Sequence, residues 1–227
     1  ETETQLALAG HPRLIGMLER FLSLRGAGEG KCMMTFGITG SRLQTRNALK
    51  EARSICKAQN GVYTGTRLGE KWAAKRFTMP YLREALWQMG YAVDTLETAT
   101  DWDNVHNLLG LIETSLRDGL KDQNENTHVF THLSHFYSQG CSIYTTYVFR
   151  VADSYEETLA RWKTLKTSTS EIIVNNRGTI SHQHGVGKDH APFLPVEKGE
   201  LGMLAIGSLC QTFDPAGLMN PQTLVQK

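Results

Sequence analysis

Two histidines and a glycine-rich turn lie close together in residues 178–187, GTISHQHGVG. His182 and His184 flank Gln183, and a Gly-Val-Gly run follows directly from Gly185. In an extended segment alternate side chains point the same way, so the two imidazoles would face one side and Gln183 the other. Glycines here would let the backbone approach a flat or phosphorylated ligand closely. The alternative is a pair of exposed loop histidines.

A tyrosine and an arginine elsewhere in the chain could also do chemistry. Tyr144 falls in the middle of a predicted strand, with Thr146 on the same face. Next to a cationic group or a flavin its hydroxyl could act as an acid or base, whereas a core tyrosine would only need a hydrogen-bond partner. Arg83 could hold a phosphate or carboxylate through two hydrogen bonds, or be an ordinary surface arginine of a helix.

Four of the histidines could bind a metal ion. His132 and His135, together with His182 and His184, could form a nitrogen-rich metal site. Such a site would usually include a carboxylate, and none adjoins these four histidines in the sequence, so we expect no metal. The chain also lacks H-E-x-x-H, C-x-x-C, G-x-S-x-G and glycine-rich phosphate motifs, which argues against the common zinc, hydrolase and dinucleotide-binding classes.

The elements that must position these residues alternate between helices and strands. Apolar spacing and capping residues predict helices over Gln5–Leu24, Arg42–Gln59, Asp101–Leu116, Ser154–Leu165 and Val196–Phe213. Strands are predicted over Cys32–Thr39, Val62–Thr64, Tyr91–Thr98, His128–Phe136 and Ser142–Val151. A turn signal at Gly140 indicates that the last two strands are antiparallel neighbours. The fold class that fits is α+β, a mainly antiparallel sheet covered by helices on one face.

Net charge, apolar runs and cysteine usage limit the binding partners and the cellular location that we expect. The 227 residues carry a formal net charge of +1, so no bulk field gathers nucleic acid, and we expect no nucleic-acid partner. No apolar run is long enough for a membrane span. Four scattered cysteines read as buried thiols in a reducing compartment, which predicts a cytoplasmic location and leaves a peripheral membrane contact open. The N-terminus has no signal-peptide pattern, and we expect the chain to be a piece of a longer protein.

Several motifs, in order, resemble one enzyme superfamily. Thr179–Gly187, followed by Phe213–Pro221, resembles the C-terminal end of FAD-linked oxidases of the vanillyl-alcohol-oxidase type. Further matches, over roughly residues 75 to 221, are Pro80–Glu84, Leu96–Trp102, Gly140–Tyr144 and Leu201–Met203. Within the superfamily the chain looks most like the alkyldihydroxyacetonephosphate synthases and their bacterial relatives.

This resemblance implies an architecture and a reaction. Such enzymes are FAD-dependent, with an N-terminal FAD-binding domain and a ferredoxin-like C-terminal cap domain that holds the substrate. Residues 1–227 would be the cap, with the FAD-binding domain absent from this chain and the fragment inactive alone. The reaction implied belongs to ether-lipid biosynthesis: a fatty alcohol replaces the acyl group of acyl-dihydroxyacetone phosphate through a flavin adduct.

The resemblance also implies roles for individual residues. By position Tyr144 matches the family's acid/base tyrosine, and Arg83 matches its substrate-contacting arginine. His182 and His184 match the outer members of a triple-histidine motif, and are expected to be catalytic. Gln183 replaces the middle histidine, and an amide cannot shuttle a proton near neutral pH. The residues expected to contact the cofactor are His182, Gln183, His184, Gly185 and Asn220.

Other interpretations stay open beside alkyl transfer. Related 2-hydroxy-acid dehydrogenases have Glu-His-Gly at this place and bind a metal through that carboxylate, which Gln183 removes. A D-2-hydroxy acid such as lactate or glycolate is nonetheless an alternative substrate for an FAD-linked dehydrogenase or oxidase. A non-catalytic scaffold fragment is a third alternative. The expected partners are a small-molecule substrate, which could be phosphorylated, and the chain's own FAD-binding domain. A homodimer is left open.

Overall fold

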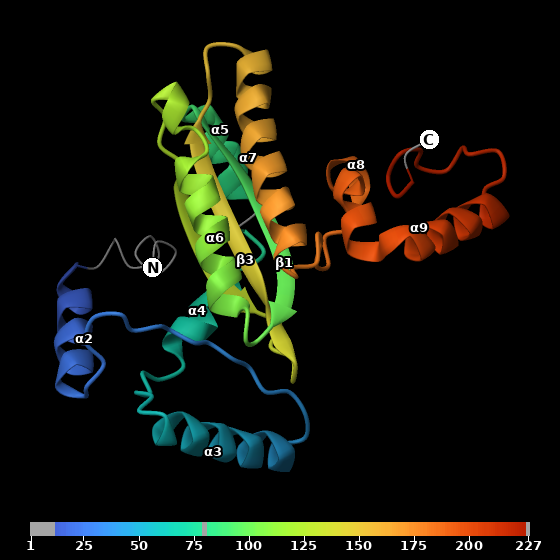
Figure 1. Ribbon diagram of the computed structural model, residues 1–227. Coiled ribbons are helices and arrows are strands. Elements are labelled where there is room, and N and C mark those ends of the chain that lie inside the picture. Colours follow the sequence, from blue (N-terminus) through green and yellow to red (C-terminus); the bar gives the residue numbers. More distant parts are fainter. Residues whose placement is uncertain (1–11, 79–80, 226–227) are drawn as a thin grey trace. The chain divides into compact units, whose positions relative to one another are not determined.

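A computed structural model describes residues 12–78 and 81–225 of the chain. It divides into two compact units, with the boundary between Leu82 and Arg83 (Figure 1). Within the described residues no helix has both the length and the apolar character needed to cross a membrane.

The first unit is helical. It contains α2 (Pro12–Leu24), α3 (Arg42–Ala58) and α4 (Arg67–Lys75). A capping box starts α3: the Gln44 backbone N–H donates to the Ser41 side chain, and the Ser41 N–H donates to Gln44 Oε1. The predicted helices over 5–24 and 42–59 are therefore confirmed, except that residues 5–11 lie outside the described residues.

The two strands predicted in this unit are wrong. Residues 32–39 and 62–64 are irregular in the structure. A strand needs a neighbour to satisfy its backbone groups, and no strand exists in the described part of this unit to provide one. Met33, Met34 and Phe36 are accordingly exposed rather than packed against a sheet.

The second unit holds the sheet. Its elements are α5 (Leu82–Gln88), β1 (Tyr91–Asp101), α6 (Val105–Asp118), η2 (Lys121–Gln123), β2 (His128–Ser134), β3 (Gly140–Arg150), α7 (Tyr155–Asn175), α8 (Gly187–His190), η3 (Ala191–Phe193) and α9 (Leu194–Phe213). The strands pair antiparallel in the order β1-β3-β2. Helices α6 and α7 lie side by side over one face of the sheet (Figure 1). The predicted α+β class and the antiparallel pairing of β2 with β3 are confirmed.

The core fills the space between the sheet and its two helices. Alternate residues of β3 are buried there, as are apolar residues of α6 and α7. The core consists of Leu96, Val105, Leu108, Ile112, Leu116, Leu120, Val129, Cys141, Ile143, Tyr147, Phe149, Leu165 and Ile173. Because side chains alternate along a strand, the residues between them on β1, β2 and β3 face the opposite, open side of the sheet.

A buried polar cluster ties α7 to the sheet within this helix-covered layer. Asp94 Oδ2 accepts hydrogen bonds from Trp162 Nε1 (2.7 Å) and Tyr147 Oη (3.0 Å), and Lys166 Nζ lies 3.3 Å away. Burial alone would raise the pKa of Asp94, but Lys166 and these donors lower it below its ordinary value. A charged Asp94, with Trp162 and Lys166 both at Oδ2, therefore ties α7 to β1.

Several element boundaries differ from the sequence prediction for identifiable reasons. The helix expected from Asp101 begins at Val105, because β1 continues through Asp101 to pair with Gly140. The helix expected to end at Leu165 runs to Asn175, since its polar residues Thr169 and Ser170 are buried rather than in a loop. The last helix begins at Leu194 and is interrupted by left-handed backbone at Gly199.

The four cysteines are free thiols, as expected, but they are not all buried. Cys141 is buried in the core, and burial raises the pKa of its thiol. Cys32 and Cys210 are exposed within this chain and Cys56 is half-buried, so the expectation that all four are buried was wrong.

Candidate active site on the open face of the sheet

Three polar side chains form a row across the open face of the sheet. The register pairs Tyr144 of the central strand β3 with Glu97 of β1 on one side and His132 of β2 on the other. Ile143 and Thr145, the neighbours of Tyr144, are buried toward the helices. The row therefore lies on the face that α6 and α7 leave uncovered.

The histidine segment docks along the edge of β1. The backbone N–H of Thr179 donates to Ala99 O (3.1 Å), and that of His182 donates to Glu97 O (3.0 Å). The Thr98 hydroxyl also donates to Thr179 O (2.7 Å). A Cβ at Gly178 would lie 2.8–2.9 Å from atoms of Thr98, Ile173 and Leu108, so only glycine fits this approach.

A carboxylate from α9 anchors the same segment from the other side. Glu197 accepts the Ile180 backbone N–H on Oε2 (2.7 Å) and the Thr179 hydroxyl on Oε1 (3.0 Å). Burial alone would raise the pKa of Glu197, but the hydrogen bonds from Ile180, Lys198 and Thr179 lower it below its ordinary value. An ionised Glu197 thus helps to set the backbone that leads into His182.

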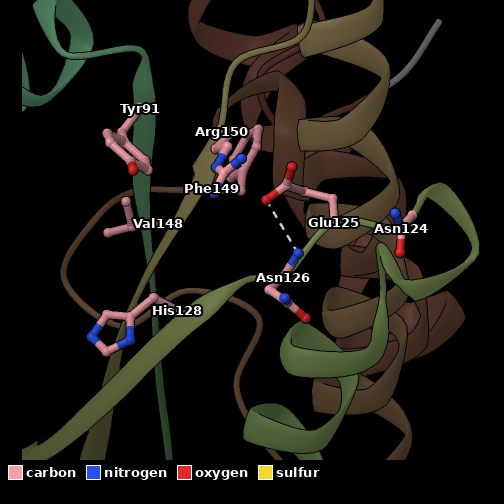
Figure 2. A pocket seen from close by; sticks show the side chains of 8 residues that line it. All are labelled: Tyr91, Asn124, Glu125, Asn126, His128, Val148, Phe149 and Arg150. Carbon is pink, nitrogen blue, oxygen red and sulfur yellow. Dashed lines mark hydrogen bonds between the residues drawn. The ribbon is translucent and has the colours of Figure 1, made fainter.

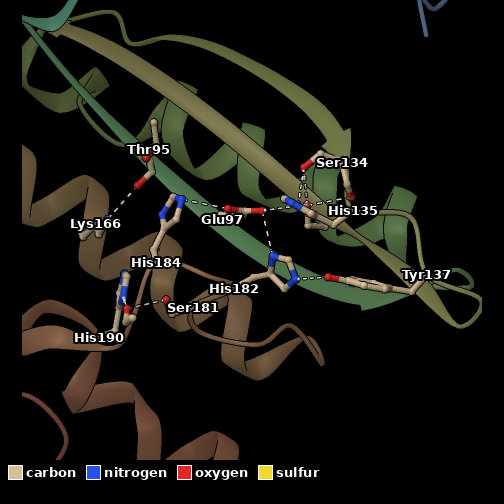
Figure 3. A network of polar contacts seen from close by, with 12 residues as sticks. Thr95, Glu97, Ser134, His135, Tyr137, Lys166, Ser181, His182, His184 and His190 are labelled. Atoms are coloured by element: carbon tan, nitrogen blue, oxygen red, sulfur yellow. Dashed lines mark hydrogen bonds and ion pairs between the residues drawn. The ribbon is translucent and has the colours of Figure 1, made fainter. Parts of the chain in front are cut away.

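Glu97 is the centre of the candidate site (Figure 3). Its side chain is only 3% exposed, and three imidazoles surround its carboxylate. Oε1 lies 3.0 Å from His182 Nδ1 and 3.3 Å from His135 Nδ1, while Oε2 lies 3.0 Å from His184 Nε2. Burying a carboxylate is costly unless hydrogen bonds and positive charge compensate it, and these rings are in position to provide both.

A second layer of contacts orients two of the histidines. His182 Nε2 lies 3.0 Å from the Tyr137 hydroxyl (Figure 3). The Tyr137 backbone is itself fixed, because its carbonyl accepts from Trp102 Nε1 (3.1 Å) and its N–H donates to Gly140 O (2.8 Å). His135 Nδ1 lies 3.0 Å from the Ser134 hydroxyl. The His182 ring is therefore held at both nitrogens, whereas His135 is held at Nδ1 alone among the contacts described.

Tyr144 lies between two imidazoles and keeps its hydroxyl free. Its ring stacks on His132 (centroids 4.8 Å apart, 21° between planes) and meets His184 edge to face (5.6 Å, 80°). No hydrogen bond to its hydroxyl occurs among the residues that the structure describes. A tyrosine hydroxyl that is positioned by its ring but unpartnered is available to a ligand. The structure thus brings Tyr144 into contact with His184, which shares the Glu97 carboxylate with His182.

The two histidines reach Glu97 in a different way from the one predicted. Gln183 adopts left-handed backbone (φ 63°) and is exposed, so the segment turns rather than continuing as an extended strand. His182 and His184 nevertheless bind the two oxygens of one carboxylate. Gly185 is exposed with φ 76°, and a Cβ there would meet nothing within 4 Å, so this turn is open on one side.

Two of the predicted site residues lie apart from this cluster. Arg83 is an exposed residue of α5 with no hydrogen bond or ion pair to any other residue in the described ranges. Asn220 is exposed beyond α9, where its carbonyl accepts the Thr223 hydroxyl (2.7 Å). The structure does not bring either side chain to Glu97, and their roles stay predictions.

Glu97 and Tyr137 were not predicted from the sequence, whereas His135 was grouped with His182 and His184 as a possible metal site and no metal was expected there. Glu97 falls within the segment Leu96–Trp102 that carries the family resemblance, but nothing in the sequence marks its carboxylate as the meeting point. The strand alternation around Ile143 and Thr145 could have placed Tyr144 on the open face. The residue opposite Tyr144 depends on strand register, which one sequence does not reveal.

A separate hollow lies at the far end of the sheet (Figure 2). It has a volume of about 210 Å³ and is lined by Tyr91, Asn124, Glu125, Asn126, His128, Val148, Phe149 and Arg150. Ligand pockets usually measure about 300–1,000 Å³ and hold convergent polar groups. The one hydrogen bond between these lining residues joins the Asn126 N–H to Glu125 Oε1 (3.1 Å). The Glu97 cluster is therefore the stronger candidate.

The sequence of the chain matches one protein family. Residues 7–224 match the model of the family "FAD linked oxidases, C-terminal domain". The chain is 26% identical to the alkyldihydroxyacetonephosphate synthases of Trypanosoma brucei brucei, over 85% of this chain and 31% of the relative, and of Dictyostelium discoideum, over 98% and 38%. It is 28% identical to an uncharacterized FAD-linked oxidoreductase of Escherichia coli K12, YgcU, over 57% and 27%.

Solved structures show the same fold. A structure of alkyldihydroxyacetonephosphate synthase superposes with a TM-score of 0.64 at 21% identity, covering 98% of this chain and 38% of that one. A second structure of that synthase gives a TM-score of 0.61 at 22% identity, covering 97% and 37%. The chain thus spans about a third of the length of the relatives and structures that it matches.

Proposed function

Because the chain belongs to the FAD-linked oxidases, as their C-terminal domain, we propose that it forms the substrate-side domain of an FAD-dependent enzyme. The observation that carries this proposal is the Glu97 carboxylate, which holds His182 and His184 beside the free hydroxyl of Tyr144. Functional groups gathered on an uncovered sheet face, with little enclosed volume of their own, suit a site that another domain completes.

The residues around Tyr144 are suited to one side of a flat cofactor ring. His184 has a side chain 35% exposed, the Tyr144 hydroxyl has no partner among the described residues, and Gly185 leaves open space where a side chain would stand. Aromatic and imidazole edges with a close-approaching backbone are the groups expected beside an isoalloxazine. When bound, FAD supplies the electron-carrying chemistry, while the protein supplies orientation and charge.

In the proposed mechanism the chain's own residues hold the substrate and move one proton. The Tyr144 hydroxyl accepts or delivers the proton at the reacting carbon or oxygen of the substrate. His184 lies against the Tyr144 ring and stabilises the charge that this transfer creates. Glu97 keeps His182 and His184 in place through its two carboxylate oxygens. Arg83 binds the anionic end of the substrate, a role taken from its sequence position alone.

For the reaction itself we propose alkyl transfer onto acyl-dihydroxyacetone phosphate, which the synthase relatives support by name. The proton shuttle in this chain cannot include residue 183, because a glutamine amide does not titrate near neutral pH. Tyr144 and His184 must then carry the transfer between them. A second candidate is oxidation of a D-2-hydroxy acid, which similarity to an FAD-linked oxidoreductase favours.

The test compares two substrate classes on the full-length flavoprotein. Acyl-dihydroxyacetone phosphates and D-2-hydroxy acids are each mixed with the enzyme without oxygen, and the flavin absorbance and products are followed. Alkyl transfer predicts exchange of the acyl group for a fatty alcohol with no consumption of an electron acceptor. Hydroxy-acid oxidation predicts lasting flavin bleaching with substrates such as D-lactate or glycolate. A protein that binds no flavin, or turns over neither class, would leave only a scaffold role.

A further inference from the structure

We propose that Glu97, His135 and His182 form a binding site for a divalent transition metal of the zinc class. One ligand atom from each residue lies within 4.8 Å of the others. Glu97 Oε1 is 3.0 Å from His182 Nδ1 and 3.3 Å from His135 Nδ1. Ligand atoms at about 2.0–2.1 Å from a tetrahedral zinc lie roughly 3.3–3.4 Å from one another, so the arrangement admits an ion with small side-chain shifts.

The donor set selects the kind of ion. Two imidazole nitrogens and one carboxylate oxygen are a typical set for zinc with an open coordination position. Magnesium and calcium prefer sets made only of oxygen, so they are poor fits. The His135 side chain is 41% exposed, which gives an ion a route in and leaves room for a further ligand. The carboxylate comes from β1 and not from residues 182–185, so Gln183 does not remove it.

One of the two tautomers of His182 leaves a place for a cation beside Glu97. The Tyr137 hydroxyl contacts Nε2 of His182 at 3.0 Å. When Nε2 carries the ring proton and donates it to Tyr137, the lone pair of Nδ1 faces Glu97 Oε1 at 3.0 Å. Two electron-rich atoms at that distance need a proton or a metal ion between them. His135 Nδ1 faces the same oxygen, and a single ion satisfies both contacts.

The surrounding contacts resemble the outer shell of a metal centre. Ligating histidines usually donate their second nitrogen to a neighbour, as His182 can to Tyr137. Ligating carboxylates usually have a polar partner at the second oxygen, and His184 Nε2 lies 3.0 Å from Glu97 Oε2. The site shares side chains with the proposed function but does not depend on it, because metal binding is measured without flavin or substrate.

The test is a metal titration of the 227-residue chain after treatment with a chelator. Zn²⁺ is expected to bind in a single equivalent that survives dialysis, and Co²⁺ to give visible ligand-field bands in the same stoichiometry. Mg²⁺ is expected not to compete. Because ligand binding displaces ring protons, affinity should fall as the pH is lowered toward about 5–6, where free histidine is protonated.

Variants distinguish Zn²⁺ binding at the Glu97 cluster from non-specific Zn²⁺ binding at the protein surface. Glu97→Gln and His135→Asn should each weaken Zn²⁺ binding by at least about tenfold. Asparagine suits position 135 because His135 has left-handed backbone (φ 46°), which asparagine tolerates. His128→Asn, on the same strand but outside the cluster, should leave affinity unchanged. His135→Asn remains informative if Glu97→Gln does not fold. Two results would overturn the proposal: the parent chain retains no equivalent of Zn²⁺ after dialysis, or the parent and His135→Asn bind Zn²⁺ with equal affinity. Either result would mean that only protons bridge the side chains of this cluster.

Discussion

Glu97 holds His182 twice: its backbone carbonyl accepts the His182 N–H at 3.0 Å, and its carboxylate lies 3.0 Å from the imidazole Nδ1. The first contact belongs to the docking of residues 179–182 along β1, and the second to the site. The same residue therefore fixes both the chain and the ring of the histidine. A change at Glu97 should affect stability and activity together.

Glu97→Gln tests this coupling. Glutamine keeps the shape and one acceptor oxygen but replaces the other with a donor, so one of the imidazole contacts turns unfavourable. We expect the free energy of unfolding to fall by about 1–3 kcal/mol, the range for hydrogen bonds to charged groups, together with a loss of turnover. Denaturant unfolding and steady-state rates measure the two effects. The matched control is Glu171→Gln, an exposed site on α7, which should change neither. Parent-like values for both in Glu97→Gln would contradict this account.

Gly178→Ala tests the close packing beneath the histidine segment. The added methyl would lie under 3 Å from atoms of Thr98, Ile173 and Leu108, so the segment must shift. Overpacking of this kind costs typically about 1–3 kcal/mol, which thermal unfolding would detect. Gly110→Ala, in α6 where an added Cβ meets nothing within 4 Å, should be neutral or stabilising. If both variants unfold alike, the packing argument fails.

Acid should selectively weaken the anchor formed by Glu197. Its folded pKa lies below its ordinary value, so the folded state binds a proton less readily than the unfolded state does. The stabilisation is therefore complete above the ordinary glutamate pKa of about 4.3, and disappears as the pH falls through the lower folded value. The difference in melting temperature between the parent and Glu197→Gln should be largest near neutral pH and vanish in strong acid. A pH-independent difference would argue against an ionised anchor.

Arg83→Lys tests the substrate role that rests on sequence position. Lysine keeps the charge but loses the two-pronged geometry that suits phosphate and carboxylate. Since Arg83 has no polar partner among the described residues, melting temperature should be unchanged, while KM for an anionic substrate should rise. Arg46→Lys, at an exposed site on α3, is the control. An unaltered KM would show that Arg83 is a surface residue without a role in binding the substrate.

Much of the fold could be predicted from local patterns. The alternation of Ile143 and Tyr147 with Tyr144 predicted a strand of a sheet with both faces in use, and Ser154 predicted the start of α7. The strands predicted at 32–39 and 62–64 failed because β-propensity alone does not provide a pairing partner.

The site was predictable only in part. The spacing of His182 and His184 indicated that they act together, and Tyr144 was a candidate from its place in a predicted strand before the family resemblance supported it. Glu97 could not be predicted, because its contact with His135 depends on the order and register of three strands. No metal was expected because no carboxylate adjoins the four histidines in the sequence. In the fold, Glu97 of β1 brings a carboxylate to His135 and His182.

The central claim, that this open face is catalytic, is tested most directly by the turnover of Tyr144→Phe in the full-length flavoprotein. The change removes one hydroxyl, which has no partner among the described residues, so flavin binding and melting temperature should stay near parent values. Loss of a general acid or base should slow turnover by about 10²–10⁴-fold. Tyr155→Phe, an exposed site on α7, should turn over normally. Unchanged turnover in Tyr144→Phe would contradict the account and make Tyr144 a packing residue.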